Sequence, residues 1–285
     1  TVVEQSPRIL VAHESKNGVF TMRGYFDSAV VKPFGERPVW EVVLVKQGGR
    51  KTIRATADHR WFVQSNTETS KTTQDLAIGD ALVPLRATRL GKEKFMPVAA
   101  GRGFVFGDGT RQSNREFMPT SVTIHTENKL VAAKQMFLPS EFMPCVANKK
   151  PATRVANLPR YWKDLPPLGE SRAFLASWLS GYFAADGSVS KSGSCVIESV
   201  DVGALQFVRE AASVCGIGCT GIRSKTHSGM GKVFTLYRVV IRRKDLPDWF
   251  FLQPHHHERA SSVASDIDRP WKVESVRNLH VDAMV

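Results

Sequence analysis

Residues 101–109, GRGFVFGDG, and residues 179–187, LSGYFAADG, decide how this chain folds. Each stretch ends a helix-sized apolar segment with the pair Asp-Gly. Both carry small residues four positions apart, namely Gly103 and Gly107 in the first and Gly181 and Ala185 in the second. Positions four apart lie on one face of a helix, and small side chains there let two backbones approach closely. The two stretches therefore predict a pair of helices packed directly against each other.

The last two residues of each stretch predict how the helices end. We expect Gly109 and Gly187 to stop the helices with a positive φ, which glycine adopts easily. Asp108 and Asp186 then stand beside each other at the ends of the paired helices. An ordinary glycine-capped helix would explain either stretch alone. Because the stretch is duplicated, we interpret the two aspartates as a functional pair.

A second matched pair of segments follows the two stretches. Residues 162–166, WKDLP, recur as residues 243–247, RKDLP. Lys163 follows Asp108 by 55 positions, and Lys244 follows Asp186 by 58 positions. Matches in register at nearly equal distances favour two copies of one αββ-type unit.

The remaining sequence alternates strand-like and helix-like segments. The pattern predicts strands at 39–45, 52–56, 61–63, 81–85, 121–124, 194–200 and 233–242, a short turn at 75–80, and helices ending at 108, 185 and 215. Residues 271–276 return to the β character of the first 84 residues. The mixture is typical of the α+β class.

The charge of the chain points to a polyanionic partner. Thirty-nine Lys and Arg residues against 27 Asp and Glu residues give a net charge of +12. Neutralising phosphates with such a surplus releases condensed counterions and favours binding to nucleic acid. The alternative is a basic surface that only keeps the protein soluble. No run of 18 apolar residues and no signal-peptide order is present, so we expect an intracellular protein without a membrane partner.

Cysteine and histidine spacings do not predict a metal centre. The four cysteines match neither a zinc ribbon nor a disulfide framework. Residues 255–258, HHHE, follow Pro254. Adjacent ligands rarely converge on one ion, so we expect a solvated loop there rather than a metal site.

The paired stretches at 101–109 and 179–187 resemble the two LAGLIDADG motifs of homing endonucleases, and the resemblance spans roughly residues 94–254. The second stretch is the closer match. The resemblance implies that Asp108 and Asp186 are catalytic and bind a divalent metal, Mg²⁺ or Mn²⁺, at the base of a DNA-binding saddle. It also implies a basic residue near each site that positions or activates water. Lys163 and Lys244 occupy that place; the alternative is two surface lysines before a Leu-Pro turn.

Basic residues near residue 230 predict the DNA-facing surface. Strand alternation puts Arg238, Val240 and Arg242 on one face, with Val239 and Ile241 opposite. Arg223, Lys225 and Lys232 flank the expected turn at 227–231. Basic side chains on a β-ribbon can enter the major groove of DNA. The alternative is a solvated edge with protective charges.

A segment near the N-terminus resembles a second family. Residues 55–63, ATADHRWFV, resemble the Thr-x-x-His motif of inteins and other Hint domains, and residues 76–80 resemble their L-x-x-G-D turn. The resemblance implies that Thr56 and His59 activate a scissile peptide bond. The nucleophile expected before Thr1 and the terminal His-Asn are not in the sequence, so we expect that this chain does not splice.

These observations combine into one prediction. Residues 1–88 and 263–285 form an all-β Hint-like splicing domain, and residues 89–262 form an inserted pseudo-two-fold αββαββ LAGLIDADG endonuclease domain. The expected protein is a monomer that cuts both strands of a long asymmetric DNA duplex site. Two alternatives stay open: a DNA-binding module whose nuclease activity has decayed, and an autoprocessing Hint protein whose insert is only structural.

Overall fold

The chain divides into two compact units. The computed structural model describes residues 19–21, 24–26, 36–46, 49–64, 69–83, 90, 93–111, 119–229, 232–262 and 270–284. One unit, here called the β unit, comprises Thr1–Thr21, Tyr25–Leu85 and Ile267–Val285. The other, called the repeat unit, comprises Met22–Gly24 and Arg86–Asp266.

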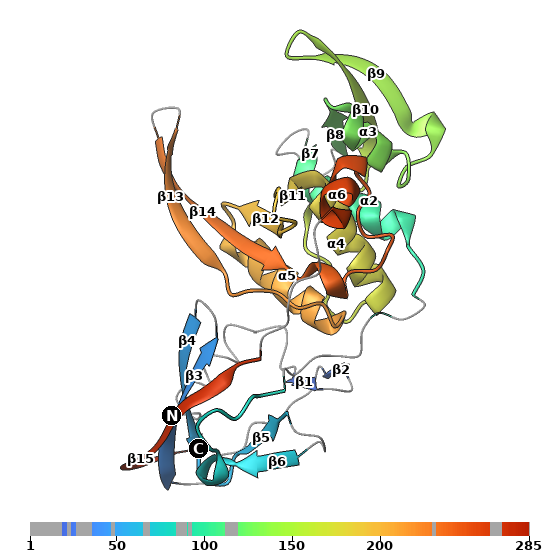
Figure 1. Ribbon diagram of the computed structural model, residues 1–285. Helices are drawn as coiled ribbons and strands as arrows, with labels where there is room; N and C mark the ends of the chain where they lie inside the picture. The colour runs from blue at the N-terminus through green and yellow to red at the C-terminus, as the bar shows by residue number, and fades with distance from the viewer. Residues whose placement is uncertain are drawn as a thin grey trace. The chain divides into compact units, whose positions relative to one another are not determined.

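A three-stranded sheet forms the main layer of the β unit. The strand β3 (Glu36–Lys46) pairs antiparallel with β4 (Gly49–Thr56) on one side and with β15 (Lys272–Met284) on the other. The first and last parts of the chain therefore share one sheet (Figure 1). Separate two-stranded sheets join β1 (Val19–Thr21) to β2 (Gly24–Phe26) and β5 (Arg60–Val63) to β6 (Thr69–Thr72).

Alternating apolar residues build the core of the β unit. Val42 and Leu44 of β3, Trp61 and Val63 of β5, and Val273 of β15 are buried together with Leu76. The 3-10 turn η1 (Thr73–Asp75) leads into the turn at residues 75–80, which was predicted. The strand expected after it is reduced to isolated bridges from Ala81 to Lys272 and from Leu82 to Val63.

The repeat unit contains the same succession of elements twice (Figure 1). The first copy runs α2 (Pro97–Asp108), β7 (Gly109–Arg111), β8 (Thr120–Ile124), α3 (Glu127–Ala133), η2 (Pro139–Glu141), β9 (Phe142–Ala147), β10 (Lys150–Leu158) and η3 (Arg160–Lys163). The second runs α4 (Arg172–Asp186), β11 (Gly187–Val189), β12 (Cys195–Ser199), α5 (Val202–Val214), β13 (Arg223–Gly229), β14 (Lys232–Ile241) and η4 (Arg243–Asp245), followed by α6 (Pro254–Ser261).

The two sheets of the repeat unit have matching strand orders, β7-β8-β10-β9 and β11-β12-β14-β13. The predicted duplication is therefore confirmed, but the repeating unit is larger than expected. Each copy is αββαββ rather than αββ. The sequence pattern missed strands of three residues, β7 and β11, and the seven-residue helix α3, because elements this short show little periodicity.

The helices α2 and α4 pack backbone against backbone at the predicted small residues. A Cβ atom placed on Gly103 would lie 2.0 Å from the carbonyl oxygen of Trp178. A Cβ atom on Gly181 would lie 1.8 Å from the carbonyl oxygen of Ala100. No side chain fits at either position, so the glycines are required by the close helix contact.

The glycines that follow the two helices act differently from the prediction. Gly109 has φ −72° and Gly187 has φ −83°, so neither uses the left-handed region. Both continue directly into a strand. A Cβ atom on Gly109 would lie 2.3 Å from the Val105 carbonyl oxygen, and one on Gly187 would lie 2.4 Å from that of Phe183. Glycine is needed at both positions because the chain passes into the strand close to the last helical turn, where a side chain would not fit.

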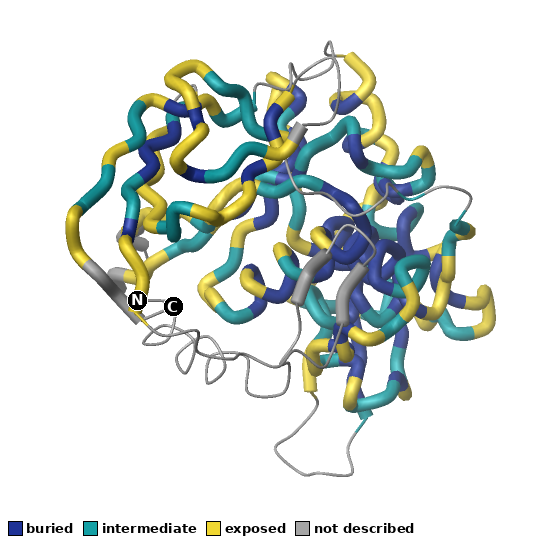
Figure 2. Tube along the Cα trace, turned by 90° about the horizontal axis from the view of Figure 1, so that it is seen from below, coloured by how far each residue is buried: buried dark blue, intermediate teal, exposed yellow. Residues whose placement is uncertain are grey.

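Burial in the repeat unit is concentrated around the helix pair (Figure 2). Every residue of α4 from Leu175 to Ala185 is buried. The first repeat adds a core of Phe104, Val122, Val155 and Trp162. The helix pair is thus held rigidly, and its carboxyl ends are held with it. Across the described residues, no helix has the length and apolar character needed to span a membrane.

The histidine run forms part of a helix, so the prediction of a solvated loop at residues 255–258 is wrong. Residues 255–258 lie in α6, which begins at Pro254, a residue that suits the first turn of a helix. His256 is only 3% exposed, and the centroid of its ring lies 5.2 Å from the centroid of the Phe183 ring. Burial against Phe183, together with His255, Arg259 and Lys129, lowers the pKa of His256 to about 4. It is therefore a neutral core residue. The four cysteines are free thiols.

Candidate functional site

Asp108 and Asp186 meet at the ends of α2 and α4, as predicted. The Asp186 Oδ2 atom would lie 2.9 Å from a Cβ atom on Gly107, so the carboxylate rests against the opposite helix. Asp186 keeps an exposed side, but burial by the surrounding helices and then the charge of Asp108 raise its pKa to about 6. The two carboxylates are therefore close enough to repel each other.

Lys129 joins this pair and was not predicted. Its Nζ atom lies 2.5 Å from Asp108 Oδ2, and the two side chains are 28% and 21% exposed. Lys129 belongs to the first turn of α3, where its backbone N–H donates to the Thr126 hydroxyl at 3.4 Å. The Thr-Glu-Asn-Lys sequence at 126–129 signals a capped helix start, but its proximity to Asp108 follows only from the fold.

Lys163 lies beside the two aspartates. The Lys163 Nζ donates to the carbonyl oxygens of Phe106 and, at 3.4 Å, Gly107 at the end of α2. Burial lowers the pKa of Lys163, and the charges of Asp186 and Asp108 oppose that shift. Lys244 is half-buried in η4, the counterpart of η3, and is engaged in contacts of its own. A catalytic role for either lysine stays a prediction.

The aspartates of the two Lys-Asp-Leu-Pro segments have different surroundings. Asp164 is exposed and pairs with Arg111 of β7 at 2.5 Å. Asp245 is 4% exposed, accepts a hydrogen bond from the Gly218 N–H at 3.0 Å and lies 3.6 Å from Arg242. The same Lys-Asp-Leu-Pro sequence therefore contributes an exposed ion pair to a strand in the first copy and a buried carboxylate to a turn in the second copy.

Three of the predicted DNA-facing residues share one face of the β13–β14 hairpin. Arg223 stands directly opposite Arg238 in the register, and both are exposed, as is Lys225 two positions along. Val239 and Ile241 are buried on the opposite face, as expected. The turn is shorter than expected, because β13 continues to Gly229. The side chain of Lys232 lies outside the described residues.

Arg242 differs from the other four. Its side chain is only 15% exposed and pairs with Asp245 at 3.6 Å. This arrangement argues that Arg242 holds the turn after β14 rather than contacting a ligand. It shares sequence alternation with Arg238, but the strand ends at Ile241 and the chain enters η4.

The sheet of the first repeat presents a matching face that the sequence did not suggest. Register pairing places Arg154 of β10 opposite Thr123 of β8 and Met143 of β9. The Arg154 guanidinium donates to Ser121 Oγ at 3.0 Å. This face lies opposite the buried Val122 and Val155. In Figure 1 the β9–β10 and β13–β14 hairpins both extend away from the helices of the repeat unit.

The aspartate pair suits a hard divalent cation. Among the described residues, no group of three or more His, Cys, Asp or Glu side chains could hold a metal. Mg²⁺ needs only one or two protein carboxylates when phosphate oxygens and water complete its shell. Two converging carboxylates, one with a raised pKa, provide that donor set. The described residues therefore fit a metal whose remaining ligands are water molecules or phosphate oxygens.

The predicted splicing residues stand in one turn of the β unit. Thr56 ends β4, and the Thr56 carbonyl oxygen accepts from the His59 N–H at 3.2 Å. The Thr56 side chain hydrogen-bonds Asp58 and lowers the pKa of that exposed carboxyl. The His59 ring lies 5.1 Å from the Trp61 ring, whose Nε1 donates to Thr73 Oγ1 at 3.0 Å.

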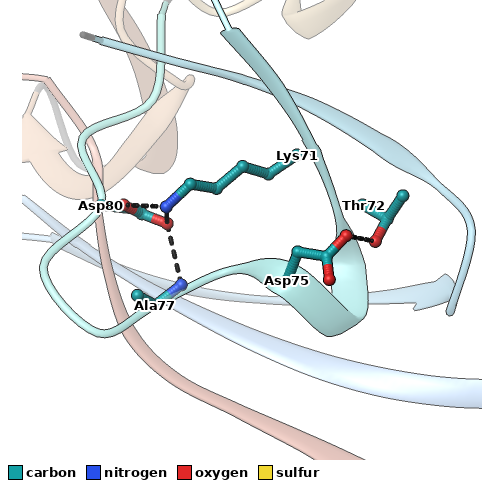
Figure 3. Close-up of polar contacts among 5 residues, drawn as sticks. All are labelled: Lys71, Thr72, Asp75, Ala77 and Asp80. Carbon is teal, nitrogen blue, oxygen red and sulfur yellow. Dashed lines mark hydrogen bonds and ion pairs between the residues drawn. The ribbon is translucent and has the colours of Figure 1, made fainter.

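The L-x-x-G-D turn is built as a side-chain-capped turn (Figure 3). Asp80 accepts from the Ala77 N–H at 2.8 Å and from Lys71 Nζ at 2.8 and 2.9 Å. Gly79 has φ +93°, which explains glycine at this position. On the adjoining turn, the Thr72 hydroxyl donates to Asp75. The motif thus has a structural role in closing the turn.

Comparison with known proteins identifies part of the repeat unit. Residues 173–251 match the LAGLIDADG-like domain family. The match runs from α4 to the residues after η4, so it covers the second repeat. The predicted LAGLIDADG-like domain is confirmed there, and no finding bears on the Hint resemblance. A search of curated proteins gives no match.

Solved structures of low sequence identity are also similar. The structure of I-DmoI in complex with DNA and Mn is 14% identical, with a TM-score of 0.35, over 52% of this chain and 90% of that one. The N-terminal LAGLIDADG domain of DUF199/WhiA is 14% identical, with a TM-score of 0.37, over 57% and 81% of the two chains. Full-length DUF199/WhiA from Thermatoga maritima is 15% identical, with a TM-score of 0.39, over 60% and 62%.

Proposed function

We propose that the repeat unit is a metal-dependent, site-specific endonuclease that cuts both strands of DNA. The observation that carries this proposal is the meeting of Asp108 and Asp186 at the ends of two closely packed helices. A core does not require two carboxylates that repel each other, and bringing them together costs free energy. Perturbed carboxylates of this kind are typical of functional sites.

The side chains around the pair suit phosphodiester hydrolysis. In this reaction a water oxygen bonds to phosphorus, one P–O bond to a sugar breaks, and a proton passes to the leaving oxygen. Asp108 and Asp186 would hold Mg²⁺ or Mn²⁺, which when bound neutralises charge on the scissile phosphate. Lys163 lies close to both carboxylates, and its lowered pKa makes its ammonium a better proton donor.

The two hairpins supply the DNA-binding surface in this proposal. Arg223, Lys225 and Arg238 present three exposed positive charges on one face of β13–β14. The corresponding face of the sheet in the first repeat carries Arg154 of β10 with Met143 of β9 and Thr123 of β8. Unequal surfaces on the two copies favour an asymmetric target read by a single chain, so we propose a monomer and a long duplex site.

A plasmid library with randomised inserts tests the proposal. In Mg²⁺ the wild-type chain should cleave a discrete set of inserts, and Asp186→Asn should lose the activity by on the order of 100-fold or more. Asp248→Asn, a change at an exposed aspartate outside the site, is the matched control. Specific binding without cleavage in Mg²⁺ or Mn²⁺ would favour a DNA-binding module instead.

We also propose that the β unit is a Hint-like frame interrupted by the repeat unit. Support comes from β15, which completes the sheet of β3 although 225 residues separate Lys46 and Lys272. Thr56 and His59 lie together in one turn of that unit. To test this proposal, the chain is joined to flanking residues that supply a nucleophile and a terminal His-Asn. If the β unit cleaves the peptide bond at its amino-terminal junction, His59→Ala should reduce that cleavage.

A further inference from the structure

The two aspartates differ in their cationic neighbours. Asp108 pairs with Lys129 at 2.5 Å, and both side chains are largely shielded from water. Among the described residues, no side chain forms an ion pair with Asp186. The charge of Lys129 nevertheless reaches Asp186, because Lys129 and Lys163 both oppose the rise in the Asp186 pKa. The Lys129 ammonium thus pairs with Asp108 and also opposes the rise in the pKa of Asp186.

The equivalent position in the second repeat is not basic. Lys129 is the third residue of α3, after the capping Thr126. The third residue of α5, after the capping Asp201, is Ala204. Both backbone N–H groups donate to their capping side chains, which fixes the alignment. Lys129 is therefore specific to the half of the site that contains Asp108.

We propose that Lys129 is a built-in competitor for divalent metal that makes the two halves of the site unequal. This inference rests on the proposed function. A divalent cation reaching Asp108 must displace the Lys129 ammonium, whereas one reaching Asp186 displaces no cation that is paired with it among the described residues. Opposite unit charges a few ångströms apart attract more strongly in a site sheltered from water than on an exposed surface, so the competition is strong. As the metal concentration rises, the site at Asp186 is therefore occupied before the site at Asp108.

The inequality has a consequence for DNA cleavage. The strand served by Asp186 is cut at lower metal concentration, and the strand served by Asp108 is cut later. The reaction then passes through a nicked duplex whose amount depends on metal concentration. Without metal, Lys129 neutralises Asp108 and reduces the repulsion between the two carboxylates.

Mn²⁺ titration of the full chain without DNA, followed by electron paramagnetic resonance, tests the competition directly. Wild type should bind two ions with affinities that differ by on the order of tenfold. Lys129→Met should strengthen the weaker site by on the order of tenfold. Lys129→Arg should restore the wild-type difference. Lys134→Met, at the exposed end of the same helix, is the matched control and should leave both affinities unchanged.

Each other outcome has a distinct meaning. Two ions bound equally by wild type and Lys129→Met would overturn the competition while leaving the proposed nuclease intact. No Mn²⁺ bound by wild type, or binding unchanged in Asp186→Asn, would overturn the metal site and with it the proposed function. Should Lys129→Met fail to fold, Lys129→Gln, which keeps a hydrogen-bond donor toward Asp108, gives the same measurement.

Discussion

The two repeats share a topology but not a chemistry. Both place an aspartate at the end of a closely packed helix and continue into a short strand. In the first repeat the aspartate is neutralised by Lys129, whereas in the second it keeps a raised pKa. The duplicated backbone preserves the positions of the two aspartates, and individual side chains differ around them. Fold symmetry therefore does not imply equal half-sites.

The hairpins extend this contrast. The β9 strand carries no charged residue, and its Met143 and Val146 are exposed. The β13 strand carries Arg223, which corresponds in register to Met143, and Lys225, and both are exposed. Apolar side chains suit the methyl groups of thymine, whereas basic side chains suit guanine and phosphate. Under the proposed function, the two copies face different DNA surfaces.

The helix contact is the feature that both repeats need most. Gly103→Ala or Gly181→Ala would place a methyl group about 2 Å from a backbone oxygen, so we expect a loss of at least ~3 kcal/mol in the free energy of unfolding, or no folded protein. Gly221→Ala, where no atom lies within 4 Å, is the control and should be tolerated. Urea unfolding measures both. Native-like stability of either helix variant would contradict the packing.

The basic hairpin face should account for much of the DNA affinity. Replacing Arg223, Lys225 and Arg238 by alanine should weaken binding by roughly 10- to 100-fold and reduce the salt dependence by about one unit of slope for each residue. Arg242→Ala, at a residue paired with Asp245, should leave the salt slope unchanged. Fluorescence anisotropy over a range of salt concentrations separates these results; equal slopes for both variants would exclude the assigned face.

The two aspartates should respond to neutralisation with opposite sign. The folded pKa of Asp186, about 6, exceeds its ordinary value of 3.8, so its charge destabilises the metal-free fold as pH rises from about 4 to above 6. Asp186→Asn should therefore stabilise the protein at pH 7.5 by on the order of 1 kcal/mol, after allowance for its exposed side. Below pH 4 the variant and wild type should be equally stable.

Asp108→Asn should instead destabilise the metal-free protein, because it leaves the half-buried Lys129 without its partner. We expect a loss of about 1 kcal/mol at pH 7.5. Thermal unfolding in EDTA compares the two variants. If both aspartate variants changed stability in the same direction, the proposed asymmetry of the pair would be wrong.

The smallest expected difference concerns the helix starts. Asp201 accepts from two N–H groups, at 2.8 and 3.3 Å, whereas Thr126 accepts from one at 3.4 Å. Asp201→Ala should cost about 1 kcal/mol and Thr126→Ala about 0.5 kcal/mol. Chemical denaturation resolves the difference, and a larger cost for Thr126→Ala would indicate that it acts through Lys129 rather than as a cap.

Sequence reasoning recovered what depends on chain periodicity and duplication. Gly103 and Gly181 indicated the helix contact because small residues recur on one helical face. Alternation along residues 233–242 placed Arg238 opposite Val239 correctly. The register of the β13–β14 hairpin then brought Arg223 onto the same face as Arg238.

Contacts that neither periodicity nor duplication marks in the sequence were beyond sequence reasoning. Lys129 reaches Asp108 only because α3 folds back onto the end of α2, and a lysine in a short helix carries no such signal. His256 was expected in a solvated loop, yet its ring packs against Phe183 in the core, a contact that its own stretch of sequence does not signal. The φ of Gly109 and Gly187 was misjudged because a helix can pass directly into a strand without a left-handed residue.

Strand-resolved cleavage of a site selected from the randomised library tests the central claim most directly. The central claim is that Asp108 and Asp186 form one catalytic pair. Wild type in Mg²⁺ should therefore convert a supercoiled plasmid carrying that site to linear product. Asp108→Asn and Asp186→Asn should each lose linear product by on the order of 100-fold while still binding the site. Linear product formed at the wild-type rate by either variant would contradict the claim.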